Sequence, residues 1–374
     1  MEIDKIVGHT AHRNHRLKLS NSMKPTIWIF SLEPLESRYT AQWHKNIPIL
    51  LTNAADGKFN IRQVDGVQRA TKVTAGAFLN FSDTNYWKSS QLCNFIELLD
   101  AGETTPNDRF LFTDIWNPVI TQVKYINDLM GYHWQLHSIA HAGAYDPSDI
   151  LGYKMEKPWP WHAERSWFHS CESTYFATEF HKNMFLKNLN IEPEFHHKAI
   201  RSGQPHTPII EQCSQYLDTP KLATMIWPHR YNDDKQPKIV EDIIDGIHGN
   251  TIITQQLDLS KEQYYKVLGN SRVMFSCSLH ENLGISIMEG VLAGVIPVLP
   301  DRCSYSEMYR PVFKYPSEWT INYESYLKYK NELVDFINDR MDNPEKYEED
   351  MRIQRSMLIG WYLNADVMIG RLLA

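Results

Sequence analysis

Two glutamates eight positions apart, Glu281 and Glu289, are the residues of this chain whose type and spacing most clearly suggest chemistry. The apolar pattern of the surrounding stretch, residues 271–300, predicts a strand, a polar loop, a helix and a second short strand. If the helix begins near Asn282, its unpaired backbone N–H groups and positive dipole end can hold an anionic phosphate. Glu289 then lies roughly 9–10 Å further along the helix axis, at about 1.5 Å per residue. That separation suits one carboxylate for a sugar and the other for a ribose, with a diphosphate between them.

The same stretch resembles the donor-binding signature of retaining GT-B glycosyltransferases of the family-4 type. The positions in register with that signature are Glu281, Gly284, Glu289, Ala293, Gly294, Pro297 and Val298. In that family the first glutamate contacts the transferred sugar and the second contacts the ribose, and the resemblance implies these roles for Glu281 and Glu289. It also places Asn282, Leu283 and Gly284 against the donor. The alternative is an ordinary β–α–β unit that carries two solvated acids.

Two cations follow the strand predicted over residues 222–227, in the sequence PHRYNDDK. In the GT-B family an arginine and a lysine at this place clamp the donor diphosphate, and the resemblance implies that role for Arg230 and Lys235. The chemistry needs such cations, because the leaving diphosphate gains negative charge in the transition state. Asp233 and Asp234 could suggest a metal site, but they fit the start of a helix better. We therefore expect no metal and no resident cofactor, only a nucleoside-diphosphate sugar, favouring UDP, as co-substrate.

A third group of polar residues follows the strand predicted over 133–140, in the sequence HAGAYDPSD. Ligands of doubly wound sheets bind beyond the carboxyl ends of the strands, so His141 should lie at the edge of the cleft. A His or Asp at this place often contacts the transferred sugar in family-4 enzymes, and His141 resembles that residue. Asp146 and Asp149 could orient an acceptor hydroxyl, or could simply form a turn and a helix N-cap.

With 374 residues the chain exceeds what one core usually serves, and its β–α alternation predicts an α/β protein of the GT-B class, with two Rossmann-like doubly wound domains facing a cleft. We expect an extension over 1–23, an acceptor-binding domain over 24–205, a nucleotide-sugar-binding domain over 206–354, and a helix over 355–374 that crosses back to the first domain. Within this frame the pattern predicts strands over 26–30, 47–51, 77–81 and 168–174, a linker over 196–219, and a capping box between Ser260 and Gln263.

Composition and cysteine usage favour a reduced compartment. No apolar run approaches the roughly 18–20 residues of a membrane span, and the first residues lack the apolar core of a signal peptide. Five cysteines are scattered without paired spacing, which predicts neither a disulfide framework nor a zinc site. We expect a cytoplasmic monomer that does not contact a membrane.

The acceptor should meet the first half of the chain. Residues 1–200 carry 20 basic residues against 21 acidic ones and twelve of the sixteen histidines, whereas the rest carries 18 against 24. Residues 153–185 are rich in aromatic residues interleaved with cations, which suits stacking of an extruded base or, equally, a buried core. The basic cluster within residues 1–23 fits a DNA-reaching arm less well than a flexible leader, and Glu33, Glu36 and Arg38 replace the glycines usual after the first GT-B strand.

Two finer resemblances address the acceptor. The segments WPHRYNDDK and SKEQYY, with the Glu281–Glu289 stretch, resemble the donor half of tRNA-queuosine mannosyltransferases. The segment FSLEPLESRYT and the aromatic stretch resemble phage glycosyltransferases that modify hydroxymethylated pyrimidines in DNA, including hydroxymethylcytosine. We therefore expect a retaining hexosyl- or pentosyltransferase acting on DNA of the hydroxymethylcytosine type. The alternatives are a transferase for tRNA or a small acceptor, a nucleotide-sugar epimerase, and a non-catalytic binding module.

Overall fold

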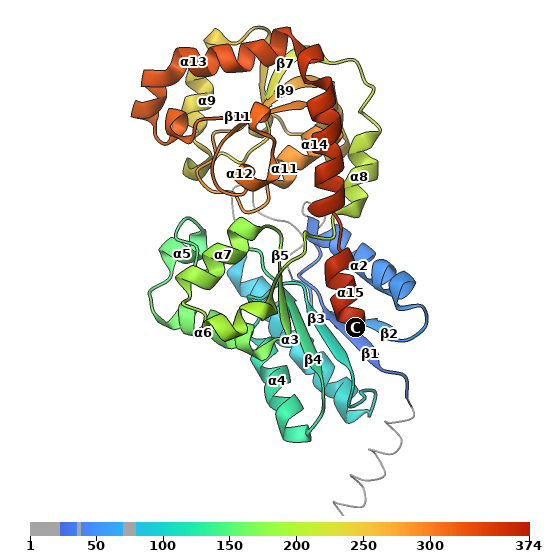
Figure 1. Ribbon diagram of the computed structural model, residues 1–374. Coiled ribbons are helices and arrows are strands. Elements are labelled where there is room, and N and C mark those ends of the chain that lie inside the picture. The colour runs from blue at the N-terminus through green and yellow to red at the C-terminus, as the bar shows by residue number, and fades with distance from the viewer. Residues whose placement is uncertain (1–22, 36–38, 70–79) are drawn as a thin grey trace, which may run out of the picture.

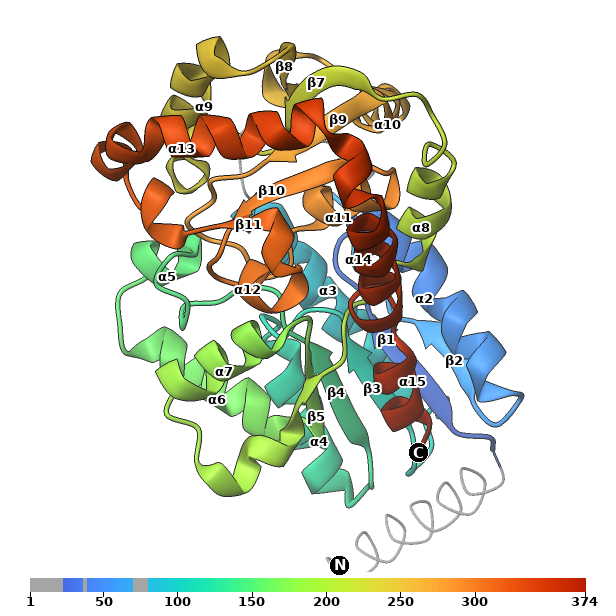
Figure 2. The same ribbon diagram turned by 45° about the horizontal axis from the view of Figure 1, so that its top comes forward.

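The computed structural model describes residues 23–35, 39–69 and 80–374 of the chain. The basic cluster before Met23, the residues Glu36 and Arg38, and most of the strand expected over 77–81 lie outside the described residues. Figures 1 and 2 show two α/β domains, one above the other, that are connected at one side.

The first domain is built on a six-stranded parallel sheet. In spatial order its strands are β2 (Asn60–Gln63), β1 (Thr26–Phe30), β3 (Arg109–Phe112), β4 (Gln135–Ile139), β5 (Ser173–Phe176) and β6 (Ala199–Arg201). The helices that follow these strands along the chain are α2 (Tyr39–Ala55), α3 (Phe81–Asp100), α4 (Val119–Met130), α5 (Ile150–Lys154), α6 (Trp159–Ser170) and α7 (Glu179–Asn188). The strand expected over 26–30 is confirmed at both ends.

The second domain repeats this plan with a five-stranded parallel sheet. Its spatial order is β11 (Lys314–Tyr315), β10 (Ile296–Pro300), β9 (Ser271–Phe275), β7 (Leu222–Trp227) and β8 (Asn250–Ile253). Its helices are α8 (Thr207–Ser214), α9 (Pro237–Ile243), α10 (Lys261–Asn270), α11 (Ile285–Leu292), α12 (Tyr305–Met308), α13 (Tyr323–Asp342) and α14 (Glu348–Trp361). The expected α/β architecture of two doubly wound sheets is confirmed.

The strand expected over 47–51 is wrong, because these residues belong to helix α2. Trp43, Ile47 and Leu51 are buried and follow one another at four-residue spacing, which is the stripe of a helix rather than the alternation of a strand. Pro48 lies inside this helix and cannot donate to the carbonyl of His44. The side-chain amide of Gln63 donates to that carbonyl instead, at 3.0 Å, so the proline leaves no unpaired acceptor there.

Three further expectations from the local pattern differ from the structure. Phe81 begins helix α3 instead of ending a strand, and Phe168 lies in α6, five residues before β5 begins. The segment expected as a linker over 196–219 contains strand β6 and helix α8. Ile209 and Cys213 of α8 are buried in the same cluster as residues of α11, so this helix is part of the second domain's core.

The chain passes between the domains twice, and the two passages are hydrogen-bonded to each other. Backbone N–H groups of Gln204 and His206 donate to the carbonyls of Tyr362 and Leu363, at 3.0 and 3.2 Å. Gly203 has φ +68°, and a Cβ there would lie 2.9 Å from the carbonyl oxygen of Trp361. A glycine is therefore required for the two passages to lie so close.

The last helix, α15 (Asp366–Leu373), returns to the first domain. The expected crossing helix over 355–374 is instead two helices, because α14 packs on the second domain through Leu358 and the chain crosses only after Trp361. Met368 and Leu372 of α15 are buried in one cluster with Ile27 and Trp43 of the first domain.

This packing predicts that Leu372→Ala destabilises the first domain by about 2–5 kcal/mol, because it leaves a cavity in that cluster. The exposed Val367 of the same helix provides the control, and Val367→Ala should change the free energy of unfolding by less than about 0.5 kcal/mol. Both are measured by denaturant unfolding followed through the buried tryptophans. Equal effects of the two substitutions would contradict the docking of α15.

Candidate active site

The candidate site lies where the strand order of the second sheet reverses. β7 and β9 are neighbours there although β8 lies between them in the sequence, and such switch points form crevices at the carboxyl ends of the strands. The loop after β7 carries Lys235, and the loop after β9 carries Glu281. The topology therefore brings together two charged side chains that are 46 residues apart in the sequence.

Lys235 and Glu281 form a largely buried ion pair. The Nζ atom of Lys235 lies 3.2 Å from Glu281 Oε2 and 3.1 Å from Asp234 Oδ2, and it also donates to Ser278 Oγ at 2.8 Å. Burial alone would lower the pKa of Lys235 and raise that of Glu281. The mutual charges outweigh burial, so the pKa of Lys235 is raised and that of Glu281 is lowered. Both groups are therefore held in their charged forms.

The loop between β9 and α11 is held in place by side chains that donate hydrogen bonds to its backbone carbonyls. Arg302 donates from Nε to the carbonyl of Ser278 at 2.7 Å and from Nη2 to the carbonyl of Cys277 at 2.8 Å. Gln236 donates to the same Cys277 carbonyl at 2.6 Å. Sequence reasoning did not single out Arg302 or Gln236, because neither belongs to a motif and both act only through the fold.

Helix α11 begins later than expected. Its first residue is Ile285 rather than a residue near Asn282, because Gly284 adopts the left-handed conformation at φ +76° and ends the loop. The N–H of Gly284 donates to Glu281 Oε1 at 2.9 Å, so this carboxylate caps the turn before the helix. The N–H groups of Ile285 and Ser286 come next, and helix geometry gives them no intrahelical acceptor. Leu283, also expected at the donor, is buried in the apolar core.

Glu289 lies on α11 and is 9% exposed. Its two carboxylate oxygens accept hydrogen bonds from the hydroxyls of Tyr264 and Tyr265, at 3.1 and 2.9 Å. Burial raises the pKa of Glu289, and the two tyrosine donors only partly oppose this. Tyr264 and Tyr265 belong to α10, whose N-terminal capping box between Ser260 and Gln263 is confirmed.

The other expected cation, Arg230, is exposed in the loop after β7. Its neighbour His229 is 4% exposed, and burial, followed by the charge of Lys235, lowers its pKa to about 3. A neutral histidine thus lies beside the Lys235–Glu281 pair, and the sequence pattern did not single it out. Asp233 to Lys235 form a short 3-10 helix, as the pattern for a helix start suggested.

His141 lies at the carboxyl end of β4 but has both ring nitrogens engaged. Nε2 is 2.7 Å from the carbonyl oxygen of Thr113, which can only accept, so Nε2 carries the proton. Nδ1 is 3.1 Å from the hydroxyl of Tyr39 and accepts from it. Burial lowers the pKa of His141, with Asp114 opposing in part. Contact with a sugar would have to exchange one of these bonds, and that role stays a prediction.

A second ion pair joins the two domains beside the candidate site. Asp146, from the loop after β4, lies 2.7 Å from Nε2 of His280, the residue before Glu281. Asn282 extends this contact, since its side-chain amide donates to the carbonyl of His141 at 3.3 Å and its own carbonyl accepts from Thr178 at 3.1 Å. The loops of both sheets therefore meet at residues 280–282. His280 was missed in the sequence because its partner comes from the other domain.

The loop that carries Asp146 is itself held by a buried carboxyl group. Glu164 of α6 is fully buried and accepts from the backbone N–H of Ala144 and from Trp116 Nε1, the latter at 2.7 Å. Burial raises the pKa of Glu164 to about 7. Asp149 is the N-cap of α5 and accepts from the N–H of Leu151 at 2.9 Å, so the turn and N-cap alternative accounts for this residue.

Residues 23–35, 39–69 and 80–374 contain neither a metal-binding cluster nor a membrane-spanning helix. No group of three or more His, Cys, Asp or Glu side chains in them could hold a metal ion. No helix in them combines the length and apolar character that crossing a membrane requires.

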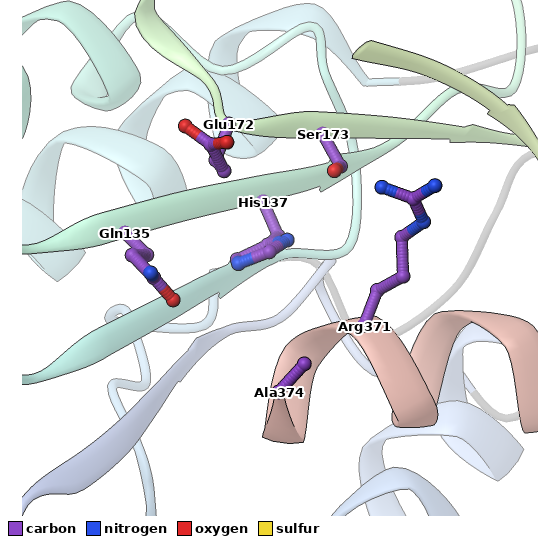
Figure 3. A pocket seen from close by; sticks show the side chains of 6 residues that line it. All are labelled: Gln135, His137, Glu172, Ser173, Arg371 and Ala374. Atoms are coloured by element: carbon purple, nitrogen blue, oxygen red, sulfur yellow. The ribbon is translucent and has the colours of Figure 1, made fainter. Parts of the chain in front are cut away.

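A hollow of about 190 Å³ lies elsewhere in the first domain, between the sheet and α15. Figure 3 shows Arg371 of α15 and Ala374, the residue after this helix, on one side of it and His137 of β4 and Ser173 of β5 on the other. Gln135 and Ser173, which line it, are the first residues of β4 and β5. The hollow therefore lies at the amino ends of the strands, away from the candidate site.

Comparison with known proteins gives a partial sequence match and full-length structural matches. No protein-family model matches the chain. It is 25% identical over 190 residues to the tRNA-queuosine alpha-mannosyltransferase of Drosophila melanogaster, which covers 37% of this chain and 50% of that protein. The chain thus matches about half the length of this curated relative.

Solved structures match over most of the chain. The UDP-forming alpha,alpha-trehalose-phosphate synthase from Burkholderia vietnamiensis has a TM-score of 0.57 at 11% identity, over 94% of this chain and 99% of that one. Sucrose-phosphate synthase from Thermosynechococcus elongatus has a TM-score of 0.55 at 12% identity, over 94% and 98%. This chain has the GT-B fold. The pneumococcal O-GlcNAc transferase GtfA, in complex with UDP and GlcNAc, has a TM-score of 0.50 at 13% identity, over 77% and 61%.

The Asp146–His280 pair of this GT-B protein predicts a specific dependence on pH. The pKa of His280 is raised above its ordinary 6.5, because Asp146 outweighs burial, and that of Asp146 is lowered below its ordinary 3.8 by His280 despite burial. The ion pair therefore makes its full contribution to the free energy of unfolding between pH 3.8 and pH 6.5, the ordinary pKa values of the two groups. Its contribution is lost as the pH rises through the raised pKa of His280 or falls through the lowered pKa of Asp146.

We expect an NMR titration to place the pKa of His280 above 6.5 in the wild type and below 6.5 in Asp146→Asn, where only the smaller effect of Glu281 opposes burial and the charge of Lys235. At pH 6 the substitution should cost about 2–3 kcal/mol of unfolding free energy. Asp128→Asn breaks the exposed Lys124–Asp128 pair and should cost less than about 0.5 kcal/mol. A wild-type His280 that titrates below 6.5 would refute the pairing.

Proposed function

We propose that this protein is a glycosyltransferase that moves a sugar from a nucleoside-diphosphate sugar of the UDP type to a hydroxyl group of a modified base in DNA, of the hydroxymethylcytosine type, with retention of the anomeric configuration. The observation that carries the proposal is the buried Lys235–Glu281 pair at the β7/β9 switch point, directly before the N-terminus of α11. A fixed cation and a carboxylate thus lie together at the carboxyl ends of β7 and β9, next to the first N–H groups of α11.

In this proposal Glu281 holds the sugar. Its two oxygens already accept from Gly284 N–H and Lys235, which orients the carboxylate and leaves further lone pairs for sugar hydroxyls. Glu289 holds the ribose, and its orientation is set in the same way by Tyr264 and Tyr265. Each glutamate is thus positioned before the donor arrives, which reduces the entropy lost on binding.

The cationic side chains act on the leaving group, which is the diphosphate. The bond between the anomeric carbon and the donor phosphate oxygen breaks, and its electron pair stays on the diphosphate. The acceptor oxygen forms the new bond to the anomeric carbon and gives its proton to the departing phosphate oxygen. Lys235, Arg230 and the N–H groups of Ile285 and Ser286 stabilise the charge that develops on the diphosphate. His141 would contact the sugar from the other domain. No metal ion is invoked for the phosphates.

The acceptor is the less constrained half of the proposal. The DNA assignment is supported by the resemblance of FSLEPLESRYT and of the aromatic stretch 153–185 to enzymes of hydroxymethylated pyrimidines. A tRNA acceptor of the queuosine type is the second candidate, and the observation that favours it is the partial match to the Drosophila melanogaster mannosyltransferase. We propose that the enzyme works as a monomer in the cytoplasm, which is the host cytoplasm if a phage encodes it.

The acceptor test is one incubation of the protein with hydroxymethylated DNA, unmodified DNA and tRNA, each with several sugar nucleotides, followed by nucleoside mass analysis. We expect a hexose or pentose mass on hydroxymethylcytosine and none on unmodified DNA. Sugar found only on tRNA would replace the first candidate by the second. Consumption of the donor to free sugar, equal with and without acceptor, would contradict transfer and indicate an epimerase-like activity.

The donor site is tested by Arg230→Ala and Glu281→Gln. Arg230 is exposed and the glutamine can still accept from Gly284 N–H, so both variants should fold. We expect each to lower kcat by about 10²-fold or more, because each removes a charge that acts on the donor in the transition state. Glu241→Ala, at an exposed position of α9, is the control and should retain activity. Unchanged turnover by Arg230→Ala or Glu281→Gln would overturn the donor assignment.

A further inference from the structure

Three large aromatic side chains within nine residues of the sequence are exposed on the first domain. Tyr153 of α5 is 64% exposed, and Trp159 and Trp161 of α6 are 55% and 37% exposed. Later aromatic residues of the stretch are buried in the core instead: Trp167, Phe168, Tyr175, Phe176 and Phe185. Core packing therefore accounts for the second part of residues 153–185 but not for Tyr153, Trp159 and Trp161.

Two cations lie between these aromatic residues in the sequence. Lys154 is exposed, and Nζ of Lys157 lies 5.8 Å from the ring centroid of Trp161 while donating to the carbonyl of Met155 at 3.0 Å. The one exposed acid between them is Glu156. We call the group of Tyr153, Lys154, Lys157, Trp159 and Trp161 the aromatic surface. It carries positive charge on a protein whose net charge is −7.

The aromatic surface packs on the loop that connects it to the candidate site. Trp161 Nε1 donates to the carbonyl of Ala144 at 3.0 Å, in the loop that carries Asp146. A Cβ on Gly152 of α5 would lie 1.7 Å from the carbonyl oxygen of Asp146, so α5 rests directly on that residue. Asp146 in turn pairs with His280 beside Glu281. Figures 1 and 2 both place α5 at the edge of the first domain that faces the second.

We propose that the aromatic surface binds a polynucleotide strand with unstacked bases and thereby holds the acceptor at the mouth of the site. The proposal rests on the proposed function and adds where the nucleic acid binds. Bases stack on exposed aromatic rings whatever their sequence. Lys154 and Lys157 bind the phosphates that link these bases. A neutral glycan could use the rings but would give the two lysines no counter-charge. Single-stranded DNA, a strand opened within a duplex and a tRNA loop share this chemistry.

The binding test uses the full-length protein and a labelled single-stranded oligonucleotide of about 15 nucleotides, at one fixed salt concentration. Trp159→Ala and Tyr153→Ala should each raise Kd by about five- to a hundredfold, which is the range for loss of one stacked base. Tyr125→Ala provides the matched control, because Tyr125 is 65% exposed on α4, a different helix of the same domain. Its Kd should stay within about twofold of wild type.

A change in the opposite direction is expected from Glu156→Gln, which removes the exposed acid and should lower Kd. Duplex DNA, tRNA and a neutral oligosaccharide are the other ligands. Tighter binding of the single strand and of tRNA than of the duplex supports unstacked bases. The proposal is overturned if Trp159→Ala and Tyr153→Ala bind the single strand as Tyr125→Ala does, or if the neutral oligosaccharide displaces it.

Transfer kinetics separate this proposal from the proposed function. Trp159→Ala should raise KM for a polynucleotide acceptor more than KM for the corresponding free modified nucleoside. If the wild type binds the single strand through the aromatic surface but transfers no sugar to any nucleic acid, the proposed function fails and the surface stands. If it transfers sugar while Trp159→Ala and Tyr153→Ala leave KM for the polynucleotide unchanged, the surface fails and the function stands.

Discussion

The buried ion pair between Lys235 and Glu281 is the interaction on which the rest of the candidate site depends. Two charges can be buried only if they neutralise each other and their remaining hydrogen-bonding positions are filled, and Ser278, Asp234 and the N–H of Gly284 do this here. Without Glu281, the lysine would lose its main reason to stay charged inside the protein. The pair therefore requires the loops after β7 and β9 to keep one fixed arrangement, which Arg302 and Gln236 supply.

The second constraint is the contact between the domains. The loop that holds Glu281 is also touched from the first domain, through Asp146 on His280 and Thr178 on Asn282. Asp146 belongs to the loop that Glu164 anchors from α6. An acceptor bound near α5 and α6 would thus lie on elements that pack against the loop of Asp146, which contacts His280 and Asn282 on either side of Glu281. This gives the two halves of the proposed reaction a common structural support.

Much of the fold was predictable because its local signals agree with its long-range ones. The strand over 26–30, the capping box at Ser260 and the strand–loop–helix–strand order of 271–300 follow from apolar periodicity and short-range hydrogen bonding. Prediction failed where a short apolar run fits the strand pattern and the helix pattern equally well. Residues 47–51 look like a strand alone, whereas Trp43, Ile47 and Leu51 together have the four-residue spacing of a helix, whose buried face packs in the core of the first domain.

The sequence by itself determined which residues are proposed to bind the donor: the glutamate pair, the cations after β7 and the glycine before α11 all belong to local motifs. Only the tertiary structure decided which of these residues touch. It pairs Lys235 with Glu281 and supplies Glu289 with hydrogen bonds from two tyrosines. It also engages both ring nitrogens of His141 and places His280 beside Asp146, which is 134 residues away in the sequence. The physical reason is that a motif records neighbours along the chain, whereas charge pairing and burial depend on which strand ends the topology brings to one edge of a sheet.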